Sequence, residues 1–291
     1  MWLSEPSSFG APLSAAPCPP RLSAAAAPLT RAVEVVDEFG QRRTIHIPAE
    51  RDLTVYVDKR ELVTLMTLGA YPEWLVLGYL RNQRLIESPA QVESITVDWD
   101  VGAAAVRTRA GLPQLEARTA QRIVTTGCGQ GSVFASVMEA ANAIQLDPDA
   151  RLRQSQLYAI LRAVREQDSV YKRAGSVHGC ALFRGEELLI FVEDVGRHNA
   201  VDTIAGWTWL QGGALLRGDD KVFYTTGRLT SEMILKAAQM GVPIVVSRSG
   251  ITQMGLEVAE RLGLCAIGRA THTRFLCYTH PERLVWDTPL P

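Results

Sequence analysis

Short apolar runs and amphipathic segments alternate along the second half of the chain, and no other feature restricts the fold as strongly. Strand patterns occupy residues 177–183, 188–192, 221–225, 243–247, 264–267 and 275–278, and helical patterns occupy residues 157–164, 198–210, 231–240 and 252–262. Gly241 and Gly263 directly follow the last two helical patterns, where a left-handed glycine commonly ends a helix. An antiparallel strand pair followed by alternating helices and strands predicts a three-layer α/β domain over residues 151–291.

The first half has a different organisation, which predicts a smaller, β-rich mixed α+β domain over residues 29–150. Strand alternation spans residues 31–48, and residues 94–108 have the pattern of a hairpin. Pro72 stands at the expected first turn of a helix, where its fixed φ and its missing N–H are tolerated. The domain ends in a glycine-rich loop that contains Cys128.

Residues 1–28 are rich in Pro, Ala and Ser, and their only charged residues are Glu5 and Arg21. A segment of this composition buries too little apolar surface to offset the entropy that it loses on ordering. We therefore predict a disordered tail over residues 1–28, ahead of the two folded domains.

The composition excludes several classes of protein. The 30 Lys and Arg residues against 31 Asp and Glu residues give a net charge of −1, which predicts no binding to nucleic acid or membranes. No apolar run approaches the roughly 20 residues of a membrane-spanning helix, and no secretory signal is recognisable. Five cysteines without a CxxC pair argue against a disulfide scaffold and against a zinc ribbon. Together these features predict a cytoplasmic protein.

Residues 127–132 form a glycine-rich segment that places Cys128 between two glycines, after a strand pattern and ahead of a helix-compatible run. A thiol near a helix N-terminus has a lowered pKa, and its thiolate is a nucleophile. This position makes Cys128 the candidate catalytic residue. The structural alternative is a glycine-rich turn in which Cys128 is merely a small side chain.

Glycine and arginine recur where three predicted strands end. Residues 193–202 (EDVGRHNAVD) bring Arg197 and His198 to the start of a helix, and Arg228 and Arg248 follow the next two strands. Helix N-termini attract anions, and guanidinium groups bind phosphate oxygens in fork geometry. The recurrence predicts a phosphate-rich ligand across this edge of the sheet. For residues 193–202, the structural alternative is a capped helix in which an Asp194–Arg197 pair only orders the turn.

His178 and Cys180 do not complete a zinc site. Zinc deaminases combine an H-x-E segment with a CxxC pair, whereas Cys180 stands where the glutamate would be and no CxxC follows. We therefore expect no tightly bound zinc, and we expect Cys180 to pack inside a strand, as free cysteines commonly do. Cys265 and Cys277 lie in apolar strand patterns and are also expected in the core.

Four segments occur in a characteristic order: residues 193–202, residues 227–233 (GRLTSEM), residues 241–249 (GVPIVVSRS), and Tyr278-Thr279 with Glu282-Arg283. This set resembles the formate dehydrogenase accessory sulfurtransferase family, FdhD, over about residues 31 to 287. The resemblance implies that residues 151–291 adopt a cytidine-deaminase-like fold from which the zinc site has been lost.

The resemblance also implies an enzyme, a sulfurtransferase. It would accept persulfide sulfur from a cysteine desulfurase and pass it to molybdenum bis(molybdopterin guanine dinucleotide), a bound substrate, before that cofactor enters formate dehydrogenase. Cys128 matches the loop cysteine that carries the persulfide in the family. The cofactor-binding segment, which would hold the guanine nucleotide moiety, matches Arg269, Ala270, Thr271, His272, Thr273 and Arg274. By analogy of fold, a homodimer is also expected.

The chain departs from the family pattern within the loop. Many members carry CxxC there, and Gly131 occupies the position of the second cysteine. One thiolate is chemically sufficient to accept and surrender sulfane sulfur, so a relay through a single cysteine is still expected. Two alternatives are a chaperone that holds the cofactor without sulfur chemistry, which the missing cysteine favours, and a nucleoside deaminase, which the missing zinc ligands disfavour.

Overall fold

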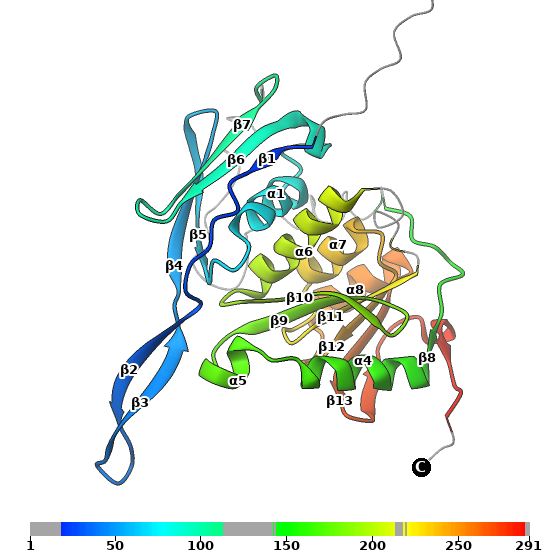
Figure 1. Cartoon of the computed structure of the whole chain (residues 1–291). Coiled ribbons are helices and arrows are strands. Elements are labelled where there is room, and N and C mark those ends of the chain that lie inside the picture. The colour runs from blue at the N-terminus through cyan, green and yellow to red at the C-terminus, as the bar shows by residue number, and fades with distance from the viewer. Residues whose placement is uncertain (1–18, 113–141, 143, 213–217, 219, 289–291) are drawn as a thin grey trace, which may run out of the picture.

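The computed structural model describes residues 19–112, 142, 144–212, 218 and 220–288, which form a mixed α/β fold with two main sheets (Figure 1). The larger sheet has the strand order β10-β9-β11-β12-β13-β14, in which β11, β12 and β13 are parallel and the other neighbours are antiparallel. Its strands lie close to the predicted patterns: β9 (His178–Arg184), β10 (Glu187–Asp194), β11 (Lys221–Thr225), β12 (Ile244–Ser247), β13 (Cys265–Thr271) and β14 (Arg274–Cys277).

Helices cover both faces of the larger sheet (Figure 1). On one face, Ile204, Met233 and Val258 join the sheet in an apolar core, and on the other face Leu157 packs with Phe183. The helices of the first face are α6 (Arg197–Gln211), α7 (Ser231–Gln239) and α8 (Gln253–Leu262), and the second face carries α4 (Gln154–Glu166).

The smaller sheet belongs to the first half of the chain and has the order β1-β6-β7-β4-β5. Leu75 and Leu80 of helix α1 (Pro72–Asn82) pack into its core, and Pro72 stands at the first turn as predicted. Almost every residue of α1 is buried, because the helix lies between this sheet and α6. The five strands are β1 (Arg21–Leu22), β4 (Arg51–Val57), β5 (Arg60–Thr67), β6 (Val92–Asp98) and β7 (Ala103–Thr108).

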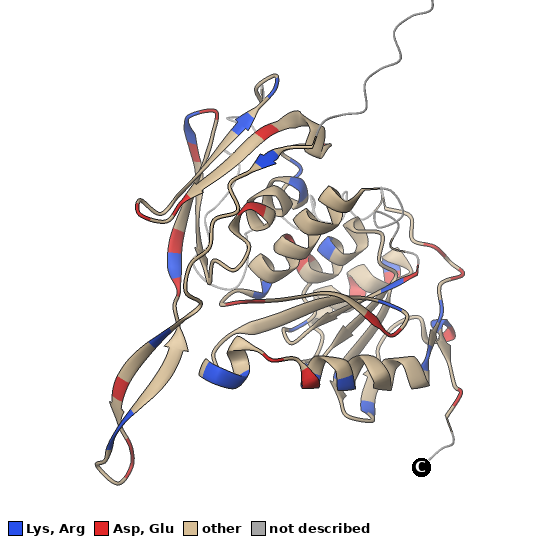
Figure 2. Cartoon of the chain, viewed as in Figure 1, with Lys and Arg blue, Asp and Glu red and all other residues tan. Residues whose placement is uncertain are grey.

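The remaining elements lie outside the two main sheets. Strands β2 (Thr30–Val36) and β3 (Arg42–Pro48) form a hairpin that extends away from the body (Figure 1), and charges of both signs are interspersed along it (Figure 2). The short elements are α5 (Val170–Ala174), η1 (Pro89–Gln91), η3 (Pro281–Arg283) and the pair β8 (Leu152–Arg153) with β15 (Leu284–Val285). Within the described residues, no helix has both the length and the apolar character to cross a membrane.

Helices α1 and α6 approach each other through glycines. A Cβ atom added to Gly78 would lie 1.7 Å from the carbonyl oxygen of Asp202, and one added to Gly206 would lie 2.0 Å from that of Trp74. The buried Asp202 carboxylate accepts a hydrogen bond from Asn82 Nδ2 at 2.6 Å. The two halves of the chain are therefore joined through close backbone packing and a buried polar contact.

Two predicted boundaries differ from the structure. Residues 19–28 do not continue the tail predicted over 1–28, because Arg21–Leu22 pairs in parallel with β6 and Glu73 accepts a hydrogen bond from Ala25 N at 2.7 Å. Local composition does not reveal these long-range partners. Residues 144–150, placed in the first domain by the prediction, pack with the second: Ile144 contacts the core of α6 and α7, and Arg283 donates a hydrogen bond to the Ala150 carbonyl.

Candidate functional site

The loops that follow the parallel strands lie side by side at one edge of the larger sheet. Thr225 O accepts a hydrogen bond from Arg248 N at 3.0 Å, so the loops after β11 and β12 are directly linked. A second hydrogen bond, donated by Arg269 N to Ser249 O at 2.7 Å, connects the loop after β12 to the second half of β13. This edge of an open α/β sheet is where ligands commonly bind.

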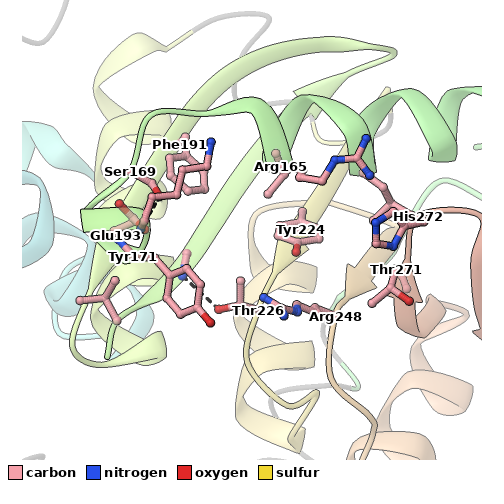
Figure 3. Close-up of a pocket in the computed structure, with 16 residues that line it drawn as sticks. Arg165, Ser169, Tyr171, Phe191, Glu193, Tyr224, Thr226, Arg248, Thr271 and His272 are labelled. Atoms are coloured by element: carbon pink, nitrogen blue, oxygen red, sulfur yellow. Dashed lines mark hydrogen bonds between the residues drawn. The ribbon is translucent and has the colours of Figure 1, made fainter. Parts of the chain in front are cut away.

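A cavity of about 290 Å³ opens at this edge (Figure 3). Its volume is at the lower end of the range for small-molecule sites in proteins. Residues from α4, α5 and five strands or their loops contribute to it, so elements distant in sequence meet there. The lining comprises Leu161, Val164, Arg165, Ser169, Tyr171, Lys172, Val177, Gly179, Phe191, Glu193, Tyr224, Thr226, Arg248, Ala270, Thr271 and His272.

The two ends of the cavity differ in chemistry (Figure 3). Tyr171, Phe191 and Glu193 lie at one end, and Arg248 and His272 lie toward the other. An aromatic end suits a planar ring, and an arginine end suits an anionic group such as a phosphate. The arrangement therefore fits an elongated ligand with a heterocycle at one end and negative charge at the other.

Glu193 fixes the aromatic end of the cavity. Its carboxylate accepts hydrogen bonds from Val170 N at 2.5 Å and Tyr171 N at 3.1 Å, at the first turn of α5. Burial raises the pKa of Glu193, although these two hydrogen bonds oppose the shift. Ser169 completes the turn, because its hydroxyl accepts a hydrogen bond from Lys172 N at 3.2 Å.

Tyr224 and Thr226 line the middle of the cavity from the end of β11. Burial raises the pKa of Tyr224 to about 12, so its phenol stays neutral at physiological pH and can donate a hydrogen bond. The Thr226 hydroxyl accepts a hydrogen bond from Gly179 N at 3.0 Å. Neutral hydroxyl groups thus separate the aromatic end from the arginine end.

The predicted cofactor segment divides between the cavity and the open surface. Ala270, Thr271 and His272 line the cavity together with Arg248, which follows β12. The other three members of the segment are absent from the lining, and all three are exposed: Arg269, Thr273 and Arg274. Positive φ angles of 50° at Arg269 and 52° at His272 shape this part of the β13–β14 hairpin.

Arg197, Arg228 and His178 form a second group at the same edge, and none of them is among the residues that line the cavity. Burial lowers the pKa of His178, and the positive charges of Arg197 and Arg228 lower it further. The stem of Arg197 packs on Gly227, where an added Cβ would lie 2.6 Å from Arg197 Cδ. His198 points elsewhere, because its Nε2 lies 3.5 Å from the Glu232 carboxylate of α7.

Asp194, the second residue of the 193–202 motif, orders the start of α6. Its carboxylate accepts hydrogen bonds from Thr67 Oγ1 at 2.5 Å, Leu68 N at 3.1 Å, Gly196 N at 3.0 Å and Asn199 Nδ2 at 3.0 Å. An ionised carboxylate has about four acceptor positions. The four donors therefore occupy all acceptor positions of the Asp194 carboxylate. This residue has a structural role: it orders the turn that precedes α6.

Sequence reasoning missed the cavity residues contributed by α4, α5 and β10. Tyr171 and Lys172 stand on α5, whose five residues are too few to show a helical period. The available signal is Ser169 ahead of this turn, since serine is a preferred N-cap residue. Arg165 directly follows the helical pattern of residues 157–164, and Phe191 lies within the strand pattern of residues 188–192. Neither periodicity indicates which residues line a cavity.

Three of the five cysteines, Cys180, Cys265 and Cys277, lie in the described part of the chain. Cys128 and the loop of residues 127–132 lie outside the described residues, as does Cys18. Cys180 is fully buried in β9, as predicted, and its thiol donates a hydrogen bond to Thr225 Oγ1 at 3.3 Å. Cys265 is buried in β13, whereas Cys277 of β14 is partly exposed rather than fully in the core. Across the described ranges, no three His, Cys, Asp or Glu side chains gather in a metal-binding arrangement.

The fold is that of a mixed α/β protein with a cavity at the carboxyl edge of the parallel strands β11, β12 and β13. Comparison with known families gives a more specific result: the model of the FdhD/NarQ family matches residues 48–285. Because this match covers most of the sequence, the chain belongs to the FdhD/NarQ family, and the resemblance drawn from the sequence motifs is confirmed.

Individual relatives agree with this assignment. The chain is 32% identical over 255 residues to the sulfur carrier protein FdhD of Halalkalibacterium halodurans, which covers 87% of this chain and 93% of the relative. It is also 32% identical over 241 residues to the sulfur carrier protein FdhD of Bacillus subtilis, with coverage of 81% and 88%. A solved structure of a formate dehydrogenase accessory protein from Desulfotalea psychrophila superposes with a TM-score of 0.70 at 26% identity, covering 89% of this chain and 100% of that one.

Proposed function

We propose that this protein is a sulfur carrier in the maturation of formate dehydrogenase. It accepts persulfide sulfur from a cysteine desulfurase and transfers it to molybdenum bis(molybdopterin guanine dinucleotide). The observation that carries the proposal is the cavity in which Arg248 meets Ala270, Thr271 and His272, in a chain whose relatives are sulfur carrier proteins. The proposal includes a cytoplasmic location and a cytidine-deaminase-like relationship for the larger sheet and its helices.

The chemistry of the cavity supports binding of a guanine nucleotide moiety. A nucleotide combines a planar base with an anionic phosphate group, which corresponds to the aromatic end at Tyr171 and Phe191 and to the positive end at Arg248. Arg165 and Lys172, which are exposed and also line the cavity, add positive charge. Guanidinium groups hold phosphate oxygens through paired N–H donors, so Arg248 is the principal phosphate ligand in this proposal.

Sulfur transfer is assigned to Cys128 by its match to the family's loop cysteine. The Cys128 thiolate attacks the terminal sulfur of the desulfurase persulfide, a new S–S bond forms on Cys128, and the desulfurase cysteine leaves as a thiolate. The acceptor then donates an electron pair to the terminal sulfur and forms a bond with it, the S–S bond on Cys128 breaks, and Cys128 leaves as a thiolate. This cycle needs one cysteine, so Gly131 in place of a second loop cysteine does not prevent it.

The experiment for this step is mass spectrometry of the intact protein after incubation with a cysteine desulfurase and cysteine. We expect the wild type to gain one sulfur atom on Cys128, and we expect the Cys18→Ala control to gain it equally. Cys128→Ala should gain none and should fail to activate formate dehydrogenase. If Cys128→Ala activates the dehydrogenase fully, the second candidate function, a chaperone that holds the cofactor, replaces sulfur transfer.

Nucleotide binding is tested separately with guanosine diphosphate. Loss of a charge-assisted hydrogen bond costs roughly 1.5–3 kcal/mol, so Arg248→Ala should weaken binding about ten- to hundredfold. Arg261→Ala is the matched control, because Arg261 is an exposed residue in the last turn of α8 and is absent from the cavity lining. Equal affinities for Arg248→Ala and the wild type, measured by isothermal titration calorimetry, would remove Arg248 from the proposed site.

A further inference from the structure

Cys265 and Cys277 form a close pair of thiols on neighbouring strands. Their Sγ atoms are 3.8 Å apart, and both cysteines are free. Cys277 pairs with Ile267 across the β13–β14 ladder, so Cys265 is its diagonal neighbour on the same face of the sheet. The proximity of the two sulfur atoms therefore follows from the strand register.

The two thiols differ in accessibility and acidity. Cys265 is fully buried, whereas Cys277 is partly exposed. The hydrogen bond with Cys277, and then burial, raise the pKa of Cys265, while the same hydrogen bond lowers the pKa of Cys277. A thiolate is the species that attacks a disulfide, and the attack requires access. Cys277 thus has the features of an attacking thiol and Cys265 those of a resolving thiol behind it.

We propose that Cys265 and Cys277 form a thiol–disulfide switch that is closed by exchange with a low-molecular-weight disulfide of the glutathione type. The Cys277 thiolate attacks one sulfur of oxidised glutathione, which forms a mixed disulfide and releases one glutathione thiolate. Cys265 then loses its proton to solvent and attacks the Cys277 sulfur, which forms the Cys265–Cys277 bond and releases the second glutathione. The protein loses two electrons, and the oxidised glutathione gains them.

The position of β14 allows the bond to form. A disulfide is about 2.05 Å long, so the sulfur atoms must approach by roughly 1.8 Å. Among the described residues, β14 is an edge strand of four residues whose one neighbour in the sheet is β13, and a short edge strand shifts more readily than a central one. The rearrangement therefore needs movement of one strand only.

Formation of the Cys265–Cys277 disulfide should change the mobility of one wall of the cavity. Residues 265 and 277 bracket the segment that carries Ala270, Thr271 and His272, which all line the cavity. A cross-link at the base of this hairpin restricts its opening, because the two strands can no longer separate at that point. The oxidised protein should therefore hold this wall more rigidly than the reduced protein.

The test uses full-length protein carrying Cys18→Ala and Cys128→Ala, in which Cys180, Cys265 and Cys277 are the remaining cysteines. After incubation with oxidised glutathione, the protein is alkylated under denaturing conditions and weighed. Closure of the switch predicts that one thiol, that of the buried Cys180, takes up the alkylating reagent, and that a cross-linked peptide joins Cys265 to Cys277. Uptake at all three thiols, or a stable glutathione adduct on Cys277 with Cys265 free, overturns the proposal.

A variant and a second measurement make the test more specific. Cys265→Ser should stop at the mixed disulfide on Cys277, since the resolving thiol is absent, and disulfide closure in this variant by another route would contradict the assigned roles. In the protein carrying Cys18→Ala and Cys128→Ala, hydrogen exchange at residues 270–272 should be slower in the oxidised form than in the reduced form. Equal exchange in the two forms would refute the link to the cavity wall.

Discussion

Replacing Gly78 by alanine tests whether the two halves of the molecule depend on glycine packing between α1 and α6. Alanine is the better helix former by about 1 kcal/mol, so an unobstructed site in the middle of a helix would gain stability from this change. At Gly78 the added Cβ would lie 1.7 Å from the Asp202 carbonyl oxygen and 2.7 Å from Gly206 N. Because of this close contact, we expect the substitution to decrease the stability of the protein instead of increasing it.

The magnitude follows from the displacement that the new methyl group requires. An ordinary contact of about 3.4 Å needs the helices to separate by roughly 1.7 Å, because dispersion contacts are optimal near this distance. Overpacking of this kind costs about 1–3 kcal/mol, and stretching the Asn82–Asp202 hydrogen bond adds about 1 kcal/mol. After subtraction of the gain in helix propensity, we expect Gly78→Ala to lower the free energy of unfolding by about 1–3 kcal/mol.

The assay is urea unfolding followed by circular dichroism, with the change in midpoint converted to a free energy. Gly250→Ala is the control, because an added Cβ there would meet only the Tyr278 hydroxyl, at an ordinary distance of 3.9 Å. We expect this control to match the wild type to within about 0.5 kcal/mol. A Gly78→Ala protein as stable as the wild type, or more stable, would refute the reasoning from close packing.

Three further predictions concern the α6–α7 interface, the strand-exit arginines and the cavity. Lys236→Met should lower the free energy of unfolding by about 3–5 kcal/mol, because it removes the ammonium group that lies 2.8 Å from the buried Asp202 carboxylate. In urea unfolding, the double variant with Asp202→Asn should regain part of this lost stability. The pKa of His178, followed by NMR, should lie below its ordinary value and rise in Arg228→Ala, whereas Arg184→Ala at the far end of β9 should leave it unchanged. Since the folded-state pKa is lowered, this histidine's contribution to stability is present above pH 6.5 and is lost as the pH falls through the folded-state value. Bound guanosine diphosphate should slow hydrogen exchange at residues 269–274 and 127–132; slowing at 269–274 alone would separate nucleotide binding from the cysteine loop.

The alternation of strands and helices was predictable because each element is marked locally. The helices α7 and α8 show an apolar period and are followed by Gly241 and Gly263, both of which have positive φ. β1 could not be predicted in this way. Its two residues pair with β6, which lies some 70 residues later in the chain; Arg21, for example, pairs with Ser94. The segment is therefore ordered by partners that local sequence does not indicate.

The cavity shows the same division between local and non-local information. The position of Arg248 at this edge of the sheet was predictable because the residue directly follows a strand. Tyr171 and Phe191 were not, because they reach the cavity through the placement of α5 against β10, which the buried Glu193 carboxylate secures. Sequence periodicity places such residues in a helix or a strand, but three-dimensional packing determines which of them line the cavity.

The contact between α1 and α6 has a consequence for synthesis of the chain. Asn82 and its partner Asp202 are 120 residues apart, and Thr67 and its partner Asp194 are 127 residues apart. At a translation rate of about 5–20 residues per second, α1 leaves the ribosome about 6–24 s before the helix that covers it. During this interval Leu75 and Leu80 can pack on the smaller sheet, but the face of α1 that carries Gly78 and packs on α6 has no partner. We therefore expect the nascent first half to be the part of the chain that chaperones bind.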